Sequence, residues 1–549
     1  MEERRASDLF VECLQAEGVR HVFGIPGEET LDLNESLERS SIEFVPVRHE
    51  QGGAYMADMY GRLTRTAGVC LGTLGPGATN LVTGVADAFL DHAPLVALTG
   101  QGDLERMHKE SHQHIDVVSM FKPVTKWNVR LNSPGMIPEV VRKAFKVAQA
   151  QKPGPTHIEL PEDVMAEPVT AAPLPVPDRI RRPTPSAEEL EEAGAIIGGA
   201  ACPIVLAGNG VARVGAAPAL RAFAAATGIG VAETFMGKGL LDYEDEHALG
   251  TVGLQERDYE LAGFKDADVV ITVGYDLVEH APSNWNGRRE KTIVCIDTAS
   301  AEVDEFFMTK IDLIGDIPSI LEALTAQLGG AGPRDVLHSR LDDIVLGRFA
   351  AGREDGAFPM RPPRALWEIR QALGPRDMLV SDVGLHKLWI ARMFPAHEPH
   401  TVFIANGLAG MGIALPTAIA AKLVHPERNV VTVNGDGGFL MNAQELETAV
   451  RLRTPIVNVI WENGQFGSIV WKQDKKFGRH FGTDFTNPDF VKLADAFGMP
   501  AWRIEAADDF GPALRRALDL DVSSLIVLPI DYGEDVAISQ ELGTETVVA

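Results

Sequence analysis

Short, nearly continuous apolar runs alternate with segments of helical spacing along most of the chain. The clearest run is PIVNVIWENG at residues 455–464, which follows a helical segment at residues 444–452. Such alternation is typical of parallel α/β sheets, and a run without polar alternation predicts a strand covered on both faces. Further runs of this kind lie at residues 68–77, 94–101, 156–161, 203–210, 267–276, 291–298 and 429–438.

Two segments interrupt this alternation. Residues 167–185 are rich in proline, which lacks an amide donor and resists both helix and sheet. Residues 329–363 combine a glycine-rich start, a predicted helix and an RPP triplet. These breaks predict an α/β protein of three domains, at residues 1–166, 188–330 and 363–549, each with a parallel sheet flanked by helices. A chain of 549 residues is long enough for three domains.

Composition narrows the classes of partner. Fifty basic and 77 acidic residues give a net charge of −27, and no basic stripe offsets it, so we expect neither a nucleic-acid nor a membrane partner. The N-terminus lacks the apolar core of a signal peptide, and no apolar run reaches the roughly 18 residues that span a bilayer. Widely spaced cysteines argue against disulfides and zinc, so we expect a cytoplasmic protein. The cysteines are Cys13, Cys70, Cys202 and Cys295.

The strongest chemical signal lies where the run at 429–435 ends, in Gly435-Asp436-Gly437-Gly438. A glycine-rich turn between strand and helix lets backbone amides approach a phosphate, and a carboxylate there suits a hard cation. The next strand closes with Asn463, which a βαβ unit brings beside Asp436. Alternatively, the turn is purely structural and Asn463 an ordinary loop residue. The predicted helix after the turn has an apolar face of Ala443, Leu446, Ala449 and Val450.

A second candidate lies in the first domain, where Glu50 follows a short strand and begins a helix in the sequence RHEQGGA. Taken alone, a glutamate in a first helical turn only complements the helix dipole. Together, the 435–438 turn, the strand ending at Asn463 and the RHE motif resemble the thiamine-diphosphate-dependent enzymes. The resemblance implies a Mg²⁺ ion held by Asp436, Asn463 and the backbone oxygen of Gln465. It also implies that Glu50 is the acid that activates the cofactor.

The same resemblance names further cofactor contacts. In the family, the position of Met411 is an apolar wedge under the bent cofactor, the carbonyl of Ala409 accepts from its amino group, and His386 lies near the diphosphate. The first and third domains of the family meet across a subunit boundary, so we expect a homodimer or homotetramer with the active site at the interface. The remaining cofactor contacts implied by the family are Pro26, Thr73, Asn80, Gly435, Gly437, Gly438, Phe466 and Gly467.

Over nearly the whole chain, the resemblance is closest to acetolactate synthases of the FAD-independent catabolic type. It implies a carboligase that decarboxylates pyruvate and joins the remaining two-carbon unit to a second 2-keto acid, with Gln113 bonding the reacting species. The alternatives are another thiamine-diphosphate-dependent 2-keto-acid decarboxylase or aldehyde-forming carboligase, a flavin-dependent oxidase, and a catalytically silent scaffold.

Several departures from the family bear on cofactor and acceptor. The turn at residues 208–210 lacks the third glycine of a dinucleotide fingerprint. The family's flavin-binding members carry a His-Gly pair where this chain continues after Gly253 with Leu254, so we do not expect bound FAD. Lys472 replaces a tryptophan of the biosynthetic relatives, Glu162 replaces a lysine or glutamine, and His112 replaces a phenylalanine. Glu162 and His112 favour the alternative decarboxylase or carboligase, whereas Lys472 disfavours the biosynthetic role with 2-ketobutyrate as acceptor. The acceptor stays open.

Overall fold

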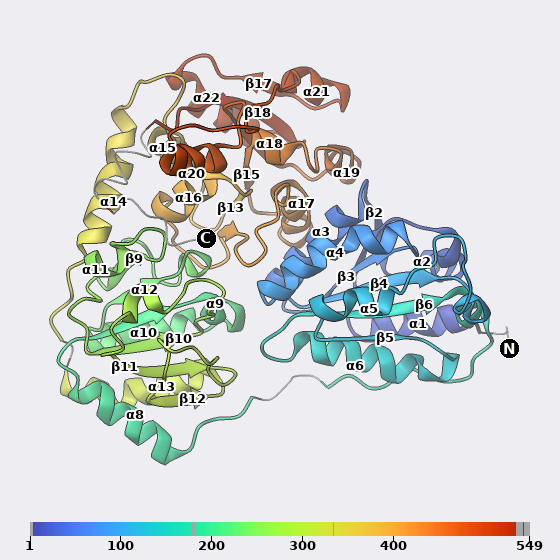
Figure 1. Ribbon diagram of the computed structural model, residues 1–549, viewed down its shortest axis with the longest axis horizontal. Helices are drawn as coiled ribbons and strands as arrows, with labels where there is room; N and C mark the ends of the chain where they lie inside the picture. Colours follow the sequence, from blue (N-terminus) through green and yellow to red (C-terminus); the bar gives the residue numbers. More distant parts are fainter. Residues whose placement is uncertain (1–3, 178–181, 333, 534–541, 543–549) are drawn as a thin grey trace.

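The computed structural model describes residues 4–177, 182–332, 334–533 and 542. They form three six-stranded parallel sheets flanked by helices, so the predicted three-domain α/β architecture is confirmed (Figure 1). Within these residues, no helix is both long and apolar enough to cross a membrane.

The first sheet has the strand order β2-β1-β3-β4-β6-β5. The order reverses direction between β1 and β3, which pair directly. Such a reversal is a topological switch point, where open α/β sheets bind ligands beyond the carboxyl ends of the strands. The elements are α1 (Ala6–Ala16), β1 (His21–Gly24), α2 (Leu31–Glu38), β2 (Glu43–Pro46), α3 (Glu50–Thr64), β3 (Gly68–Gly72), α4 (Pro76–Leu90), β4 (Leu95–Gln101), α5 (Val117–Phe121), β5 (Trp127–Arg130), α6 (Ile137–Gln149), β6 (Pro155–Pro161) and α7 (Glu162–Ala166).

The third sheet repeats this arrangement, with the order β14-β13-β15-β16-β18-β17 and a switch point between β13 and β15. Strand β16 corresponds to the apolar run at 455–464, and it pairs in parallel with β15 as the sequence predicted. The elements are α15 (Pro362–Ala372), β13 (Met378–Ser381), α16 (Leu385–Met393), β14 (Val402–Ile404), α17 (Ala414–Val424), β15 (Val430–Gly435), α18 (Asp436–Phe439), α19 (Glu445–Leu452), β16 (Val457–Glu462), α20 (Gly467–Phe477), α21 (Phe490–Ala496), β17 (Ala501–Arg503), α22 (Ala507–Leu518) and β18 (Ser524–Pro529).

The middle sheet has the order β12-β11-β10-β7-β8-β9, in which the two halves meet between β10 and β7. This is the doubly wound order of dinucleotide-binding domains. The elements are α8 (Ala187–Gly199), β7 (Pro203–Ala207), α9 (Asn209–Val214), α10 (Ala217–Thr227), β8 (Val231–Glu233), β9 (Ala248–Thr251), α11 (Asp258–Leu261), β10 (Val269–Val273), α12 (Ser283–Asn286), β11 (Thr292–Asp297), β12 (Ile311–Ile314) and α13 (Ile317–Leu328).

The two linkers differ in structure. The proline-rich linker ends where Ser186 caps helix α8: its hydroxyl accepts from the amide of Glu189 at 3.2 Å, and the Glu189 carboxylate accepts from the Ser186 amide at 2.7 Å. This reciprocal capping box fixes the start of the middle domain. The second linker contains the predicted helix, α14 (Arg340–Ala351), before α15 begins at Pro362.

One local prediction is wrong. The helix expected directly after the 435–438 turn is divided into the single turn α18 and the later helix α19. Ala443 therefore precedes α19, and Val450 lies on its exposed side. Helix α18 therefore contains most of the glycine-rich turn, while α19 faces the first domain.

The third domain joins the other two. One hydrophobic cluster contains Leu81 of the first domain and Ile419 of the third, and helices α3 and α17 pack together. Another cluster contains Trp285 of the middle domain and Trp389 of the third. Figure 1 shows the first domain in blue and the middle domain in green, each against the orange and red third domain.

Candidate active site

Glu50 lies at the switch point of the first sheet, as the first residue of α3. Its side chain is buried, and its Oε2 atom accepts a hydrogen bond of 2.9 Å from the amide nitrogen of Asn80 on α4. Its Oε1 atom lies beside Gly77, 3.3 Å from where a β-carbon on that glycine would stand. The structure therefore brings together Glu50 and Asn80, two of the residues that the sequence assigned to the cofactor.

Thr73 and Pro26 follow β3 and β1, the two strands that meet at this switch point. The Thr73 hydroxyl donates to Glu29 at 2.7 Å and packs on the turn that contains Pro26. Gln113 lies in an exposed loop, and its carbonyl faces Gly75 at the start of α4. Glu50, Asn80, Thr73, Pro26 and Gln113 thus belong to one region.

Glu162 lies near the same region, at the start of α7. Burial raises the pKa of this carboxyl, and the nearby charges of Asp103 and Glu29 raise it further. Glu29 also accepts the hydrogen bond from Thr73. The negative charge of Glu162 therefore acts on a residue at the edge of the candidate site.

Asp436 lies at the switch point of the third sheet, immediately after β15. Its Oδ2 atom accepts from the backbone amides of Asn463 and Gly464 at 2.9 and 2.7 Å, and its Oδ1 atom from that of Gly437 at 3.0 Å. The Asn463 side-chain oxygen in turn faces the amide of Gln465. The predicted proximity of Asp436 and Asn463 is therefore present.

Asn487 is a neighbour of Asp436 that the sequence did not reveal. Its side-chain nitrogen donates to Asp436 Oδ2 at 2.8 Å, while its buried oxygen has no hydrogen-bond partner. An orphaned acceptor beside a carboxylate is the kind of group that a bound cation or its water satisfies. No regular spacing links Asn487, in a loop 51 residues later, to the 435–438 turn.

The donor set around Asp436 fits Mg²⁺. Among the described residues, no three His, Cys, Asp or Glu side chains form a potential metal-binding group. A cation here would rely on one carboxylate, on neutral amide and carbonyl oxygens such as those of Asn463 and Gln465, and on the charge of a phosphate ligand. Mg²⁺ commonly binds beside substrate phosphates through one or two carboxylates in this way.

The glycines of the turn are required by close packing. A β-carbon on Gly438 would stand 2.3 Å from the Asp382 carboxylate, and one on Gly437 would stand 2.8 Å from the ring of Phe466. Phe466 precedes Gly467, the first residue of α20. Only glycine lets the backbone amides of this turn remain accessible to a phosphate.

His386, on α16, lies beside Gly435 at the same switch point. Burial lowers the pKa of this imidazole to about 3, so the ring is neutral at physiological pH. Its Nε2 atom is buried without a hydrogen-bond partner. The ring also hydrogen-bonds the backbone of Asp382, which uses the single N–H of the neutral imidazole. Its Nε2 atom therefore offers a lone pair beside the glycine-rich turn.

The loop that carries Ala409 and Met411 is held from two sides. Asp382 accepts from the amides of Gly412 and Ile413 at 2.8 and 3.3 Å, and burial raises the pKa of its carboxyl to about 7. From the first domain, Asp91 accepts from the amide of Gly407 at 2.6 Å. Only the structure reveals the contact of Asp382 with this loop.

Glu445 connects the two switch-point regions within one chain. Its Oε1 atom accepts from the amides of Arg48 and His49 at 3.0 Å each, and its Oε2 atom from the hydroxyl of Thr448 at 2.6 Å. Helix α19 thereby fixes the residues that precede Glu50. However, no hydrogen bond or ion pair within the described part of the chain joins Glu50 itself to Asp436.

In the middle domain, the turn at residues 208–210 makes internal contacts. The amides of Gly208 and Gly210 donate to the carbonyls of Val273 and Gly274 at 2.9 and 2.8 Å, and the amide of Asn209 donates to Glu279 at 3.0 Å. In dinucleotide-binding turns such amides face a pyrophosphate. Here these three amides already donate hydrogen bonds to protein oxygens.

Comparison with known proteins matches all three domains. The N-terminal thiamine pyrophosphate (TPP) binding domain, the central domain and the C-terminal TPP binding domain of thiamine pyrophosphate enzymes match residues 4–120, 190–324 and 382–528. An acetolactate synthase of Bacillus subtilis (strain 168) is 34% identical over 98% of this chain and 95% of its own length. A catabolic acetolactate synthase of Raoultella terrigena is 35% identical over 96% of this chain and 95% of its own length.

Proposed function

Because the chain belongs to the family of thiamine pyrophosphate enzymes, which it matches in all three domains, we propose that it is an acetolactate-forming carboligase. In this reaction two pyruvate molecules lose one carbon dioxide and join to form acetolactate. The observation that carries the proposal is the pairing of two switch points. One holds the buried Glu50–Asn80 pair, and the other holds Asp436 with Asn463 and a glycine-rich turn.

When bound, thiamine diphosphate supplies a nucleophilic carbon and the electron sink that decarboxylation of a 2-keto acid requires. Glu50 holds and releases the proton that sets the state of the cofactor's pyrimidine ring. Asn80 donates to one carboxylate oxygen and leaves the other free for this task. A positioned carboxyl is suited to this role because it can take up and return one proton.

The third domain binds the charged end of the cofactor. Asp436, Asn463 and the backbone oxygen of Gln465 would hold Mg²⁺, which neutralises the diphosphate. Gly437 and Gly438 would let the diphosphate approach the backbone of the turn. His386 would lie beside it, with its unpartnered Nε2 atom available as an acceptor.

A second copy of the chain would complete the site. Glu50 and Asp436 have no direct contact within one chain, and exposed apolar side chains surround the glycine-rich turn and α20. Among them, Phe481 is 83%, Phe477 64% and Met441 47% exposed. Exposed apolar groups gathered at a ligand site are typical of an interface. A homodimer, or a homotetramer built from dimers, would cover them and join Glu50 of one chain to Asp436 of the other.

The protein would work without flavin, because the amides of the 208–210 turn already bind protein oxygens. All four cysteines are free thiols, which agrees with a reducing cytoplasmic location.

The alternative function is a thiamine-diphosphate-dependent 2-keto-acid decarboxylase or aldehyde-forming carboligase. The observation that favours it is Glu162, whose negative charge near Glu29 would weaken binding of a second, anionic keto acid.

Incubation of the purified protein with pyruvate, thiamine diphosphate and Mg²⁺ would separate the two functions. Acidification converts acetolactate into acetoin, which is measured by its colour reaction. A carboligase gives one acetolactate for each carbon dioxide released. Carbon dioxide accompanied by acetaldehyde, and no acetoin after acidification, would contradict the proposal.

A further inference from the structure

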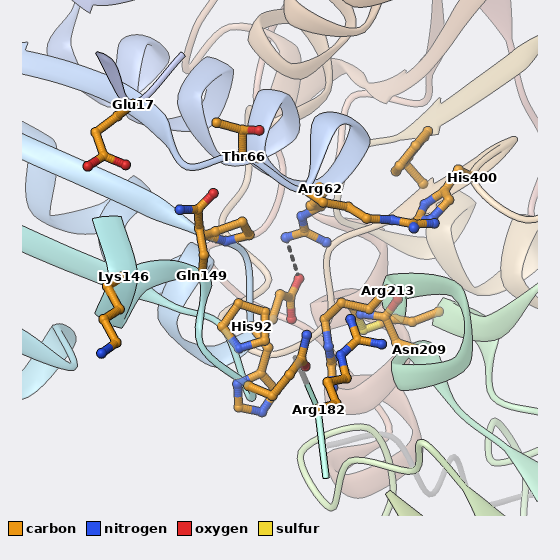
Figure 2. Close-up of a pocket in the computed structure, with 18 of the residues that line it drawn as sticks. Glu17, Arg62, Thr66, His92, Lys146, Gln149, Arg182, Asn209, Arg213 and His400 are labelled. Carbon is orange, nitrogen blue, oxygen red and sulfur yellow. Dashed lines mark hydrogen bonds and ion pairs between the residues drawn. The ribbon is translucent and has the colours of Figure 1, made fainter. Parts of the chain in front are cut away.

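A cavity of about 810 Å³ lies where the three domains meet, away from both switch-point clusters. Its walls come from α3, α6 and the end of α4 in the first domain, from the linker at residues 175–177, from α9 in the middle domain and from β14 in the third. Figure 2 shows Arg62, His92 and Arg213, which come from different segments of the chain, grouped around one space. The volume is typical of a pocket for a small molecule.

Basic side chains outnumber acidic ones in the lining, where Glu17 and Asp91 are the acidic residues. Arg62, Arg142, Arg182 and Arg213 each pair with a carboxylate. The positive charge that remains to attract an anion therefore comes mainly from Arg65 and Lys146. The basic side chains of the lining, apart from histidines, are Arg62, Arg65, Arg142, Lys146, Arg182 and Arg213.

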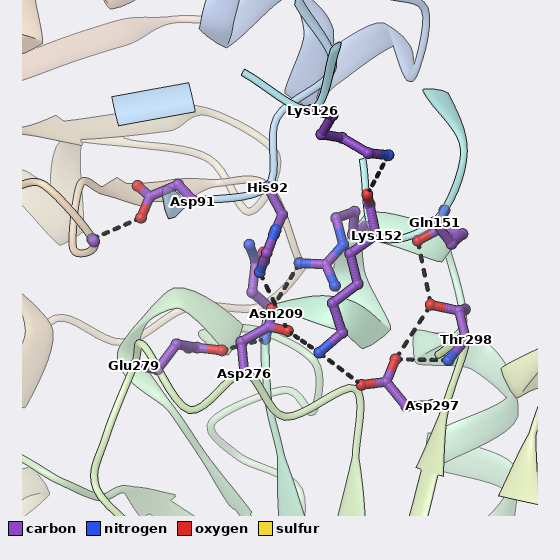
Figure 3. Close-up of polar contacts among 12 residues, drawn as sticks. Asp91, His92, Lys126, Gln151, Lys152, Asn209, Asp276, Glu279, Asp297 and Thr298 are labelled. Atoms are coloured by element: carbon purple, nitrogen blue, oxygen red, sulfur yellow. Dashed lines mark hydrogen bonds and ion pairs between the residues drawn. The ribbon is translucent and has the colours of Figure 1, made fainter. Parts of the chain in front are cut away.

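Arg213, on α9, is the most deeply buried of these cations, with 9% of its side chain exposed. One terminal nitrogen pairs with Asp276 at 2.7 Å, whereas its Nε atom and its other terminal nitrogen have no hydrogen-bond partner. Figure 3 shows Asp276 at the centre of a network that also contains Lys152 and His92. Lys152 pairs with Asp276 at 2.6 Å and also with Asp297 at 3.2 Å, so Arg213 and Lys152 share the neutralisation of Asp276 while two nitrogens of Arg213 keep unused donors.

Arg65 is a second arginine of the lining whose guanidinium has donors without a partner among the described residues. It follows the last residue of α3, and its guanidinium lies against Gly215 at the end of α9 in the middle domain. Within the described residues, neither Arg65 nor Lys146 makes a side-chain hydrogen bond or an ion pair. A guanidinium presents its donors in a planar fork that matches a phosphate group.

This cavity differs from the sites already described. It shares no lining residue with the Glu50 or Asp436 clusters. Nor is it a dinucleotide turn, because the amides of residues 208–210 bind protein oxygens. The apolar side chains of Val176, Met236 and Phe403 complete the lining and would accommodate an organic group.

We propose that this cavity, hereafter the junction pocket, binds a small molecule that carries phosphate groups, with Arg65 and Arg213 as its principal anchors. Since the walls belong to all three domains, the bound anion would tie the domains together and stabilise their arrangement. The proposal does not depend on which reaction the enzyme catalyses.

Calorimetric titration of the enzyme loaded with thiamine diphosphate would test this proposal. The probes are orthophosphate, pyrophosphate and phenyl phosphate, at constant ionic strength and with Mg²⁺ in excess over every probe. We expect one molecule bound per chain and a higher unfolding temperature. Tighter binding of pyrophosphate identifies an inorganic polyphosphate, and tighter binding of phenyl phosphate an organic phosphate.

Two variants and a control locate the site. Arg65→Gln and Arg213→Gln should each weaken binding of the preferred probe at least tenfold, because each loses a charged fork. Arg288→Gln changes an exposed arginine outside the pocket and should not weaken binding. If Arg213→Gln does not fold, the comparison of Arg65→Gln with Arg288→Gln tests the proposal. No binding of any probe, or equal affinity in Arg65→Gln and Arg288→Gln, would overturn the proposal.

Discussion

The Oε1 atom of Glu445 lies 3.0 Å from the backbone nitrogen of His49, the residue that caps α3 and directly precedes Glu50. The residues come from different domains and are 396 positions apart. Glu445 therefore sets the start of the helix that presents the proposed catalytic acid.

Glu445→Ala should lower both stability and kcat. The amides of Arg48 and His49 would lose their acceptor, which costs about 1–3 kcal/mol for buried groups. The shift of α3 would displace Glu50 from its proposed catalytic position, and kcat should fall. Urea unfolding and steady-state kinetics measure both effects. Glu445→Gln, which keeps an acceptor oxygen, should recover most of the activity, and Glu447→Ala on the same helix serves as the control. A kcat unchanged in Glu445→Ala would contradict the positioning role.

Asn487→Ala should raise the Mg²⁺ concentration needed for half-maximal activity by roughly 10- to 100-fold, the usual effect of removing a residue that orients a metal ligand. The reason is that Asp436 Oδ2 loses a donor that orients it. At saturating Mg²⁺, kcat should stay near that of the wild type. Titration of activity with Mg²⁺ checks this, with Asn34→Ala as a remote control. If Asn487→Ala and Asn34→Ala reach half-maximal activity at the same Mg²⁺ concentration, Asn487 does not support the metal site.

Asp382 should make the stability of the cofactor-free protein depend on pH. Its pKa is about 7 in the folded chain, above the value of about 3.9 in an unfolded one, so the folded state binds the proton more tightly. The free energy of unfolding should therefore fall as pH rises from about 4 to about 7, by at most about 1.4 kcal/mol per pH unit from this group.

Urea unfolding at pH 5, 6 and 7 of the wild type and of Asp382→Asn measures this contribution. The difference between the two proteins should change with pH in this direction, because asparagine does not titrate. A difference that stays constant across the range would show that the carboxyl remains ionised in the folded state.

Glu162→Gln should improve acceptance of the second keto acid and lower its KM several-fold. The reason is that the amide removes the negative charge that Glu162 adds near Glu29 and Asp103. Steady-state kinetics with pyruvate at pH 8 measures this. Equal KM values for the variant and the wild type at pH 8 would mean that Glu162 does not reach the acceptor.

The sequence predicted those site residues that directly follow the ends of strands. Asp436 and Asn463 end two strands that pair directly, so the period of apolar runs was enough to predict their proximity. Glu50 was found through a short motif at a helix start. The three domains followed from the alternation of runs and from the proline-rich break, because these patterns record burial and backbone chemistry directly.

Contacts between distant segments could not be predicted in this way. Asn487 reaches Asp436 from an irregular loop, and Glu445 reaches His49 across a domain boundary. Neither contact has a sequence period, since each depends on how the packed domains meet. The interruption between α18 and α19 was missed for the same reason: tertiary packing of Glu445 against the first domain overrides the local helical pattern.

The central claim is that acetolactate forms at a site shared by Glu50 of one chain and Asp436 of another. Glu50→Gln should be nearly inactive alone, since loss of acid–base catalysis costs about 100- to 10,000-fold. Asp436→Asn should also be nearly inactive alone, because it removes the proposed carboxylate ligand of Mg²⁺. Co-expression with different tags and two-step purification selects assemblies that contain both variants. Such an assembly pairs the intact Glu50 of one chain with the intact Asp436 of the other, and should recover on the order of a quarter to a half of wild-type acetolactate formation. Activity as low as that of either variant alone would contradict the shared site.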